Sequence, residues 1–227
     1  MKYNIVTIGG GSGLSTLLRG LKNYPVDITA VVAVSDDGGS SGKLRTELGV
    51  LPPGDIRNCL VALSEEENLM TKLFSYRFPK KGFLSNHSFG NLFLTALSSI
   101  SGGFDKAISN ASRILAIKGK VLPVSLDNVI LKAELEDGTK VSGETKISKS
   151  KKTISKVEIF PTNAKSSKTV TNAILKADYV ILGPGSLYTS IIVNLLFKDV
   201  MNALKKNKSK KDICLQYNDT IWRNYEF

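Results

Sequence analysis

A glycine-rich stretch near the start of the chain reads Gly9-Gly10-Gly11-Ser12-Gly13-Leu14-Ser15. It follows an apolar run at residues 3–8 and precedes residues 16–21, whose apolar spacing fits a helix. A strand, a glycine loop and a helix in this order are typical of a phosphate site in an α/β sheet. Glycines let the backbone approach an anion, and the first helical N–H groups point at it. We therefore predict that these seven residues bind phosphate, with Ser12 and Ser15 as hydroxyl donors and Ser15 as the helix N-cap.

The glycine spacing matches neither of the two common nucleotide motifs. Leu14 stands where the dinucleotide fingerprint has its third glycine, and no Gly-Lys-Ser/Thr follows as in a P-loop. A tight strand-to-helix turn without a ligand is therefore the alternative. The position of the stretch, at the first junction of a strand with a helix, favours phosphate.

A second stretch of the same kind lies near the other end of the chain. The apolar residues 177–182 run into Gly183-Pro184-Gly185-Ser186-Leu187-Tyr188-Thr189-Ser190. Gly183 and Gly185 free the backbone, and Ser186 can cap the following helix. Because ligands of doubly wound folds bind outside the carboxyl ends of the strands, we expect the two glycine loops to face one another and grip one ligand.

Two acids come directly after the second predicted strand. The apolar run at residues 28–34 is typical of a buried parallel strand, and it ends in Ser35-Asp36-Asp37-Gly38-Gly39-Ser40-Ser41-Gly42. In a doubly wound fold this strand end carries the acid that meets a ribose, while a carboxylate there could also hold Mg²⁺ against a diphosphate. We predict a long flexible loop in which Asp36 or Asp37 has one of these roles. A solvated Asp-Gly turn is the alternative.

The segment Pro52-Pro53-Gly54-Asp55 is expected to end one element of secondary structure and to precede a new helix. Asp55 is the expected N-cap of a helix at residues 56–63, and Arg57 and Asn58 lie at the start of that helix. A capping aspartate with an exposed arginine and a cluster that contacts a ligand are equally compatible with this local pattern.

The only histidine, His87, adjoins Ser88, Gly90 and Asn91 just before an apolar helix. A lone histidine is more often structural than catalytic. Its polar neighbours and its place at a helix start nevertheless make the segment a candidate for ligand contact.

Composition and charge indicate a soluble globular protein. The chain has 227 residues, of which 42% are hydrophobic and 22% charged, and it has no apolar run of membrane-spanning length. Cys59 and Cys214 are too far apart to indicate a disulfide scaffold or a zinc site. We expect a cytoplasmic protein.

The net charge of +11 lies in residues 146–211, which hold fourteen lysines and three acids. Scattered lysines with little aromatic interleaving argue against nucleic acid as a partner. We expect a solvated basic face that helps to attract a phosphorylated ligand.

These elements together predict an α/β fold: a Rossmann-like, doubly wound, mainly parallel sheet in one domain. From about residue 118 to 147 the apolar period changes, and runs at 129–135 and 139–147 flank the hairpin signal Glu136-Asp137-Gly138. We expect a small antiparallel β-hairpin insert around residues 118–147.

Five segments closely resemble the bacterial gluconeogenesis factors, the YvcK branch of the superfamily that includes the archaeal 2-phospho-L-lactate transferase CofD. The segments are residues 8–13, 35–42, 51–58, 87–91 and 182–190, and the resemblance covers roughly residues 1–205. It implies a Rossmann-like sheet, a UDP-sugar ligand such as UDP-N-acetylglucosamine, and a cytoplasmic role in cell shape and wall synthesis on gluconeogenic carbon. Cell-wall synthesis proteins as partners and a homo-oligomer belong to the same expectation. The transferase branch implies Mg²⁺ and transfer of a phospholactyl group from a nucleotide diphosphate to a flavin-like acceptor.

The chain departs from this family pattern at two places. Val193 precedes Asn-Leu-Leu where the family has proline, and after Lys205 the pattern is lost. We expect one Rossmann-like domain over residues 1–227 whose C-terminal part, which completes the sugar side of the site, is incomplete.

Two functional hypotheses follow from different classes. The first is a regulatory nucleotide-sugar binder without turnover, supported by the absence of a nucleophile–base pair from the sequence pattern. Residues 9–15 would bind the diphosphate, Asp36 or Asp37 a ribose or metal, and Gly183, Gly185, Ser186 and Leu187 a second anion. Further ligand contacts are expected from Gly38, Gly39, Ser40, Ser41, Asp55 and His87.

The second hypothesis is a Mg²⁺-dependent transferase like CofD. Its catalytic candidates are Asp37, Asn58 and Asn91, with Asp37 also the candidate metal ligand. GDP would then be the nucleotide, while an NAD-dependent oxidoreductase is weaker because the fingerprint is broken.

Overall fold

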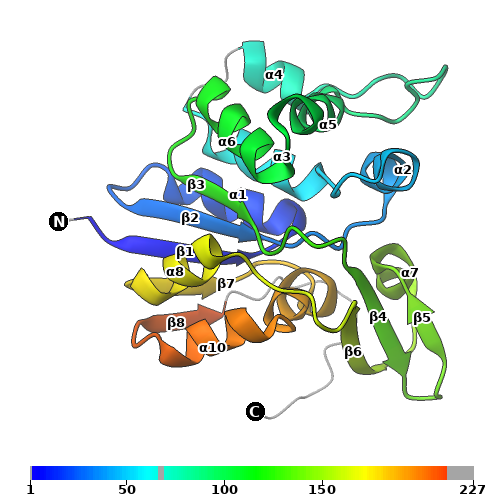
Figure 1. Cartoon of the computed structure of the whole chain (residues 1–227), viewed down its shortest axis with the longest axis vertical. Helices are drawn as coiled ribbons and strands as arrows, with labels where there is room; N and C mark the ends of the chain where they lie inside the picture. Colours follow the sequence, from blue (N-terminus) through cyan, green and yellow to red (C-terminus); the bar gives the residue numbers. More distant parts are fainter. Residues whose placement is uncertain (1, 66–68, 214–227) are drawn as a thin grey trace.

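The computed structural model describes residues 2–65 and 69–213. Its main sheet has five parallel strands in the order β3-β2-β1-β7-β8 (Figure 1). These strands are β1 (Asn4–Gly9), β2 (Asp27–Val32), β3 (Lys120–Pro123), β7 (Tyr179–Leu182) and β8 (Lys210–Ile213). The strand order reverses between β1 and β7, as in a doubly wound sheet, and the predicted fold class is confirmed.

Helices cover both faces of this sheet (Figure 1). One core cluster joins the sheet to α1 (Gly11–Leu21), α3 (Gly54–Leu63), α4 (Leu69–Ser75), α5 (Phe89–Ser101) and α6 (Phe104–Ile114). The other joins it to α8 (Lys168–Lys176) and α10 (Lys198–Lys206). Further helical segments are α2 (Gly39–Leu48), the π-helix η1 (Leu187–Ile192) and α9 (Val193–Leu195).

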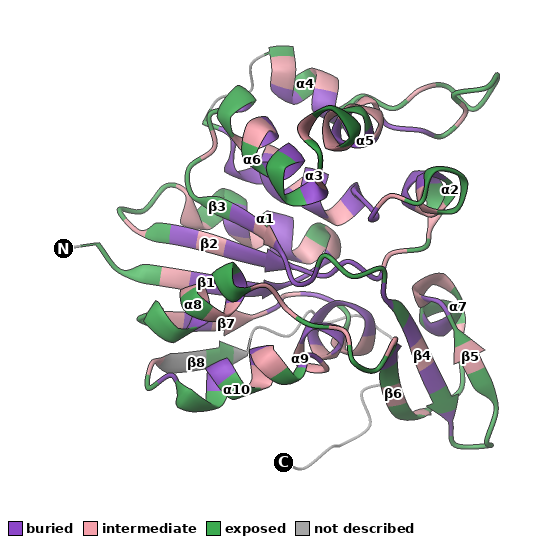
Figure 2. Ribbon diagram, viewed as in Figure 1, coloured by how far each residue is buried: buried purple, intermediate pink, exposed green. Residues whose placement is uncertain are grey.

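Strand β2 shows why the middle of the sheet is largely apolar on both faces. Ile28, Ala30 and Val32 pack into one core, whereas Val31 and the following Ala33 pack into the other. Successive side chains of a strand point to opposite faces, so a strand covered on both sides buries side chains on both faces; in β2 only Asp27, at its start, is exposed, and Thr29 is half-buried. In Figure 2 the buried residues accordingly run through the middle of the main sheet.

A three-stranded antiparallel sheet in the order β5-β4-β6 lies beside the main sheet (Figure 1). It comprises β4 (Ile130–Leu135), β5 (Lys140–Ser142) and β6 (Ile154–Phe160), with α7 (Glu144–Lys149) between the last two. The predicted insert is confirmed, but the bounds 118–147 are wrong. Residues 120–123 form β3 and pair in parallel with β2, because short apolar runs do not reveal the direction of their partner. Gly143, at φ 99°, ends β5 early, so the strand predicted at 139–147 gives way to α7.

Two predicted helix starts and one predicted loop are also wrong. The helix expected from residue 16 begins at Gly11, and Ser15 donates from Oγ to the carbonyl of Ser12 instead of capping it. α3 begins at Gly54 without a side-chain cap. The long flexible loop expected over residues 35–42 is helical from Gly39, since its buried serines fit a crowded first turn of α2. Ser186 does occupy the N-cap position of η1, without a side-chain hydrogen bond.

Among the described residues, no single helix is long and apolar enough to cross a membrane. One bent pair of helices, residues 187–195 and 198–206, reaches that length and apolar character only when the two helices are taken together. Cys59 is a buried free thiol in α3. Its pKa is raised, mainly by burial and secondly by the nearby charge of Asp55. Cys214 lies outside the described residues.

Candidate functional site

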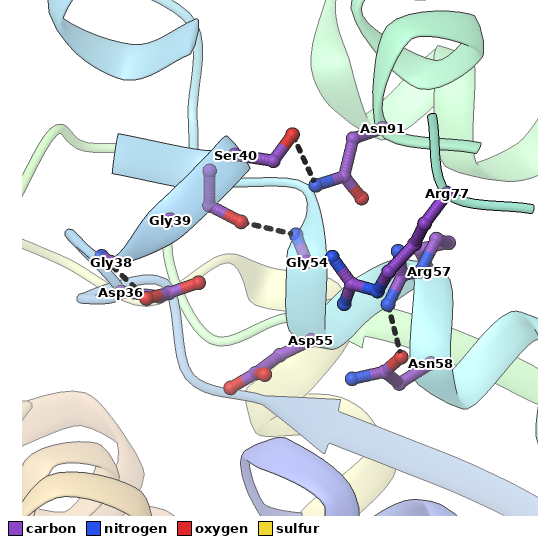
Figure 3. Close-up of a pocket in the computed structure, with 11 residues that line it drawn as sticks. Asp36, Gly38, Gly39, Ser40, Gly54, Asp55, Arg57, Asn58, Arg77 and Asn91 are labelled. Atoms are coloured by element: carbon purple, nitrogen blue, oxygen red, sulfur yellow. Dashed lines mark hydrogen bonds between the residues drawn. The ribbon is translucent and has the colours of Figure 1, made fainter. Parts of the chain in front are cut away.

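A pocket of about 240 Å³ lies beyond the carboxyl end of β2, where ligands of doubly wound folds bind (Figure 3). The first turns of α2 and α3 form most of its wall, and α5 and the segment before it supply the rest. The lining residues are Asp36, Gly38, Gly39, Ser40, Ser41, Gly54, Asp55, Arg57, Asn58, Arg77 and Asn91. Two helix N-termini at one pocket favour an anionic ligand, because their free N–H groups carry partial positive charge.

Two arginines give one side of the pocket a positive charge (Figure 3). Arg57 is 6% exposed; its Nη2 donates to Asn58 Oδ1 at 2.6 Å, while its buried Nη1 has no partner. Burial, followed by the charge of Arg77, lowers the pKa of Arg57 to about 10, although Asp55 and Asp36 act in the opposite direction. A buried donor without an acceptor, next to a second cation, is the electrostatic pattern that an anion would relieve.

Gly90 makes the position of Arg57 possible. A Cβ added at Gly90 would lie 2.8 Å from Arg57 Cδ and 2.6 Å from the carbonyl oxygen of Phe74. The aliphatic stem of Arg57 therefore crosses α5 at the one residue of that turn without a side chain, which holds the guanidinium group against the pocket.

Carboxylates lie on the opposite side of the pocket from the arginines (Figure 3). Burial, followed by the charge of Asp36, raises the pKa of Asp55 to about 6, although the N–H of Gly11 and the charge of Arg57 act in the opposite direction. Glu144, at the start of α7, belongs to the same electrostatic cluster. Burial, then Asp55 and Asp36, raise its pKa to about 8, and the hydroxyl of Ser35 donates to it at 3.3 Å.

Replacement of Glu144 by glutamine should stabilise the protein at alkaline pH. Because the folded pKa of Glu144 is about 8 and its ordinary value 4.5, the folded state binds more protons than the unfolded state between these values. Its contribution to the free energy of unfolding therefore falls as the pH rises through this window. We expect Glu144→Gln to exceed the parent by about 2 kcal/mol at pH 9, less than the full shift because the site can relax. The two proteins should converge near pH 4.5.

Urea unfolding at both pH values measures this difference. Glu47→Gln, on the exposed end of α2, is the matched control and should give no pH-dependent difference. An equal effect of both substitutions would mean that the surroundings of Glu144 do not raise its pKa.

A buried hydrogen-bond network joins α2 to α5. Asn91 Nδ2 donates to Ser40 Oγ at 3.1 Å, and Ser40 Oγ lies 3.0 Å from His87 Nδ1. Ser88 caps α5, since its Oγ accepts from the N–H of Asn91. The sequence pattern shows no nucleophile–base pair, and the structure corrects this: the Ser40 hydroxyl and the His87 imidazole are within hydrogen-bond distance. His87 does not itself line the pocket.

The two glycine loops face one another as predicted, but they pack directly together. A Cβ at Gly185 would lie 2.8 Å from Ser190 Cβ and 3.5 Å from the carbonyl oxygen of Gly10. A Cβ at Gly9 would lie 3.7 Å from the Cα of Gly183. The residues from this pair of loops that were expected to bind ligand are absent from the pocket lining: Gly9, Gly10, Gly11, Ser12, Gly13, Leu14, Ser15, Gly183, Gly185, Ser186 and Leu187.

Asp55 occupies the anion position at the start of α1. Its carboxylate accepts the N–H of Gly11, and a Cβ at Gly10 would lie 2.9 Å from Asp55 Oδ2. The contact that the sequence assigns to a phosphate is thus made by a carboxylate of the protein itself. Phosphate binding by residues 9–15 stays a prediction.

Asp37 faces away from the pocket, toward the small sheet. Its Oδ1 accepts from the backbone N–H of Thr145 at 2.8 Å and from the hydroxyl of Thr145 at 2.7 Å. A Cβ at Gly143 would overlap its carboxylate. Asp37 therefore holds the start of α7 in place through its hydrogen bonds to Thr145. The other two predicted catalytic residues, Asn58 and Asn91, do line the pocket. In the described part of the chain, no group of three or more His, Cys, Asp or Glu side chains could hold a metal ion.

Sequence reasoning missed two residues of this site. Arg77 lies in the segment between α4 and α5, where its backbone pairs with Ser88. Glu144 comes more than a hundred residues after Asp36 and is brought to the acids by the tertiary fold, in which the next residue, Thr145, bonds to Asp37. Neither residue belongs to a glycine or proline motif, so no local signal marks them.

Comparison with known proteins places this geometry in a family. The model described as 2-phospho-L-lactate transferase CofD matches residues 5–217. The chain belongs to the CofD family. It is 55% identical over 207 residues to a putative gluconeogenesis factor of Nostoc sp., and 50% identical over 210 residues to the gluconeogenesis factor of Bacillus subtilis. A solved UPF0052-family protein from Bacillus halodurans has a TM-score of 0.91 at 51% identity.

The resemblance to the gluconeogenesis-factor branch of the CofD family is therefore confirmed. The matches cover 91–94% of this chain but less of the relatives: 45% of the Nostoc protein, 66% of the B. subtilis protein and 68% of the B. halodurans structure. The chain thus spans about half the length of the Nostoc relative.

Proposed function

We propose that this CofD-family protein binds a nucleotide diphosphate of the UDP-sugar type, such as UDP-N-acetylglucosamine, in the pocket between α2 and α3. The observation that carries the proposal is the buried guanidinium of Arg57, whose Nη1 has no partner although it lies beside a pocket that Arg77 also lines. A diphosphate supplies acceptors for both arginines and lies in the positive field of two helix N-termini, at one of which the N–H of Gly54 is bonded to Ser41 Oγ. The role that we propose is regulatory and cytoplasmic, in support of cell shape and wall synthesis on gluconeogenic carbon; the name of the relatives, gluconeogenesis factor, supports the link to gluconeogenesis.

The phosphates would lie on the arginine side of the pocket, not on the first glycine loop. The N–H of Gly11 is bonded to Asp55, so a phosphate there would have to displace a buried carboxylate. A Mg²⁺ ion bound with the nucleotide would be held by Asp36 and Asp55, which supply the oxygen ligands that this ion prefers. The carboxylate of Asp37 is bonded to Thr145 instead.

A CofD-like transferase is the second candidate. It is favoured by the hydrogen bond between the Ser40 hydroxyl and His87 next to the pocket, an arrangement that can activate a hydroxyl group. In-line displacement at a diphosphate otherwise needs mainly positioned cations, which Arg57 and Arg77 provide.

Calorimetric titration with UDP-N-acetylglucosamine, GDP and NAD, each with and without Mg²⁺, separates the candidates. The proposal predicts that UDP-N-acetylglucosamine binds most tightly, with or without Mg²⁺, and is recovered unchanged. GDP binding that requires Mg²⁺, together with transfer of a phospholactyl group from a nucleotide-diphosphate donor to an added flavin-like acceptor and release of the nucleoside monophosphate, would establish the transferase. Binding of NAD alone, or of none of the three ligands, would contradict both.

Replacement of Arg77 by glutamine should weaken nucleotide binding by about tenfold, because one exposed charge-assisted contact to phosphate is lost. The dependence of affinity on salt should weaken as well. The side chain of Arg77 is exposed, so the fold should be retained. Calorimetry at two salt concentrations gives both quantities. Arg113→Gln, an exposed arginine of α6 outside the pocket, is the control and should leave affinity unchanged.

A further inference from the structure

Two buried polar atoms in the pocket wall have no hydrogen-bond partner: Arg57 Nη1 and Asn91 Oδ1. Both residues are more than nine-tenths buried. In Figure 3 the amide nitrogen of Asn91 points to Ser40, and its oxygen points away from Ser40, toward the side where the arginines lie. Buried polar groups are nearly always paired in folded proteins, so two unpaired atoms in one pocket wall indicate a ligand that pairs with both.

The two atoms need opposite partners. Arg57 Nη1 is a donor and requires an acceptor, whereas Asn91 Oδ1 is an acceptor and requires a donor. They are held near one another because the stem of Arg57 packs against Gly90, the residue before Asn91. The ionised oxygens of a diphosphate are acceptors only and cannot bond to Asn91 Oδ1. A hydroxyl group on the neighbouring carbon skeleton can donate to it.

Ser40 and His87 fix the orientation of the Asn91 amide. Because Asn91 Nδ2 donates to Ser40 Oγ, the single hydroxyl proton of Ser40 is free to bond to His87 Nδ1, 3.0 Å away. This chain of donors leaves Asn91 Oδ1 as the atom turned to the pocket. His87 thus acts through Ser40 as a positioning residue, without touching the ligand.

We propose that Asn91 selects the ligand by accepting a hydrogen bond from a hydroxyl group next to the phosphate bound at Arg57. The pocket would therefore take a phosphate ester of a polyol and discriminate against a diphosphate that lacks the hydroxyl. This inference rests on the proposed function, since it assumes that a nucleotide diphosphate binds in the same pocket. The hydroxyl comes either from the ribose or from the attached sugar, and both sources present the same donor to Asn91.

Affinity measurements with matched analogues test the selection. The ligands are UDP-N-acetylglucosamine, its 2′,3′-dideoxyuridine analogue, and the β-methyl ester of UDP, which has the same charge but no sugar. The parent protein should bind one of the two analogues at least about tenfold more weakly than the complete ligand. A loss of this size is expected when the analogue lacks the hydroxyl group and leaves the buried Asn91 Oδ1 without a hydrogen bond. Loss with the dideoxy analogue would identify the ribose hydroxyl, and loss with the methyl ester the sugar hydroxyl.

Asn91→Ala should abolish this preference, so that the complete ligand and the disfavoured analogue bind within about twofold of each other. His87→Leu should reduce the preference in the same direction, because Ser40 then no longer orients the amide. Asn110→Ala in α6, outside the pocket, is the control and should keep the full preference. Asn91→Ser replaces the alanine variant if circular dichroism shows that alanine prevents folding.

The outcomes separate this inference from the function on which it rests. If the complete ligand binds but neither analogue is weaker, or if Asn91→Ala keeps the full preference, selection by Asn91 is wrong and nucleotide binding still holds. If the parent protein binds none of the three ligands, the proposed function is wrong, and the inference fails with it.

Discussion

Replacement of Arg57 by methionine is expected to weaken nucleotide binding by about 100-fold without destabilising the free protein. The substitution keeps an unbranched stem to pack against Gly90 and removes the guanidinium group. Loss of a desolvated charge contact to phosphate costs several kcal/mol of binding energy. The free protein, in contrast, loses a buried cation with an unpaired nitrogen and a lowered pKa. Replacing such a group by an apolar side chain is often neutral or stabilising.

Calorimetry and thermal unfolding measure the two effects on the same sample. Arg19→Met, at the exposed end of α1, is the matched control and should change neither binding nor stability. A large loss of stability in Arg57→Met with unchanged affinity would show that Arg57 is a structural residue.

Replacement of Gly42 by alanine is expected to destabilise the fold by about 3 kcal/mol or more. An added Cβ there would overlap the carbonyl oxygen of Asp37, a backbone atom that cannot move without shifting the whole segment that precedes α2. Asp37 fastens α7 and Asp36 lines the pocket, so the same clash should disturb both. Denaturant unfolding gives the magnitude.

Gly20 provides the opposite result from the same substitution. It also lies inside a helix, α1, but a Cβ there would meet no atom within 4 Å. Gly20→Ala should therefore stabilise the protein by about 0.5–1 kcal/mol, because alanine loses less backbone entropy than glycine. Similar changes in the free energy of unfolding for Gly42→Ala and Gly20→Ala would contradict the close contact between Gly42 of α2 and the backbone of Asp37.

Local motifs allowed the sequence to predict the fold and much of the pocket. Parallel strands covered on both faces are continuous apolar runs, so β1, β2 and β7 are visible in the sequence. Residues that follow such strands gather at one edge of the sheet, which is why Asp36, Gly38 and Ser40, the residues after β2, line the pocket.

The sequence could not predict which residues at this edge line the pocket and which make structural hydrogen bonds, because this depends on packing between distant segments. Asp36 and Asp37 are neighbours in the sequence, yet one lines the pocket and the other bonds to Thr145. The glycines at positions 9–11 look like a phosphate loop, but Asp55 accepts the N–H of Gly11. A carboxylate and a phosphate satisfy the same helix N-terminus, and only the tertiary fold shows which one is present.

The position of the phosphates in a crystal of the complex tests the account most directly. After UDP-N-acetylglucosamine is soaked in, we predict that a phosphate oxygen lies within hydrogen-bond distance of Arg57 Nη1, with the Asp55 carboxylate still bonded to the N–H of Gly11. Phosphates bound to the N–H groups of residues 9–13, with Asp55 displaced and Arg57 still unpaired, would contradict the account.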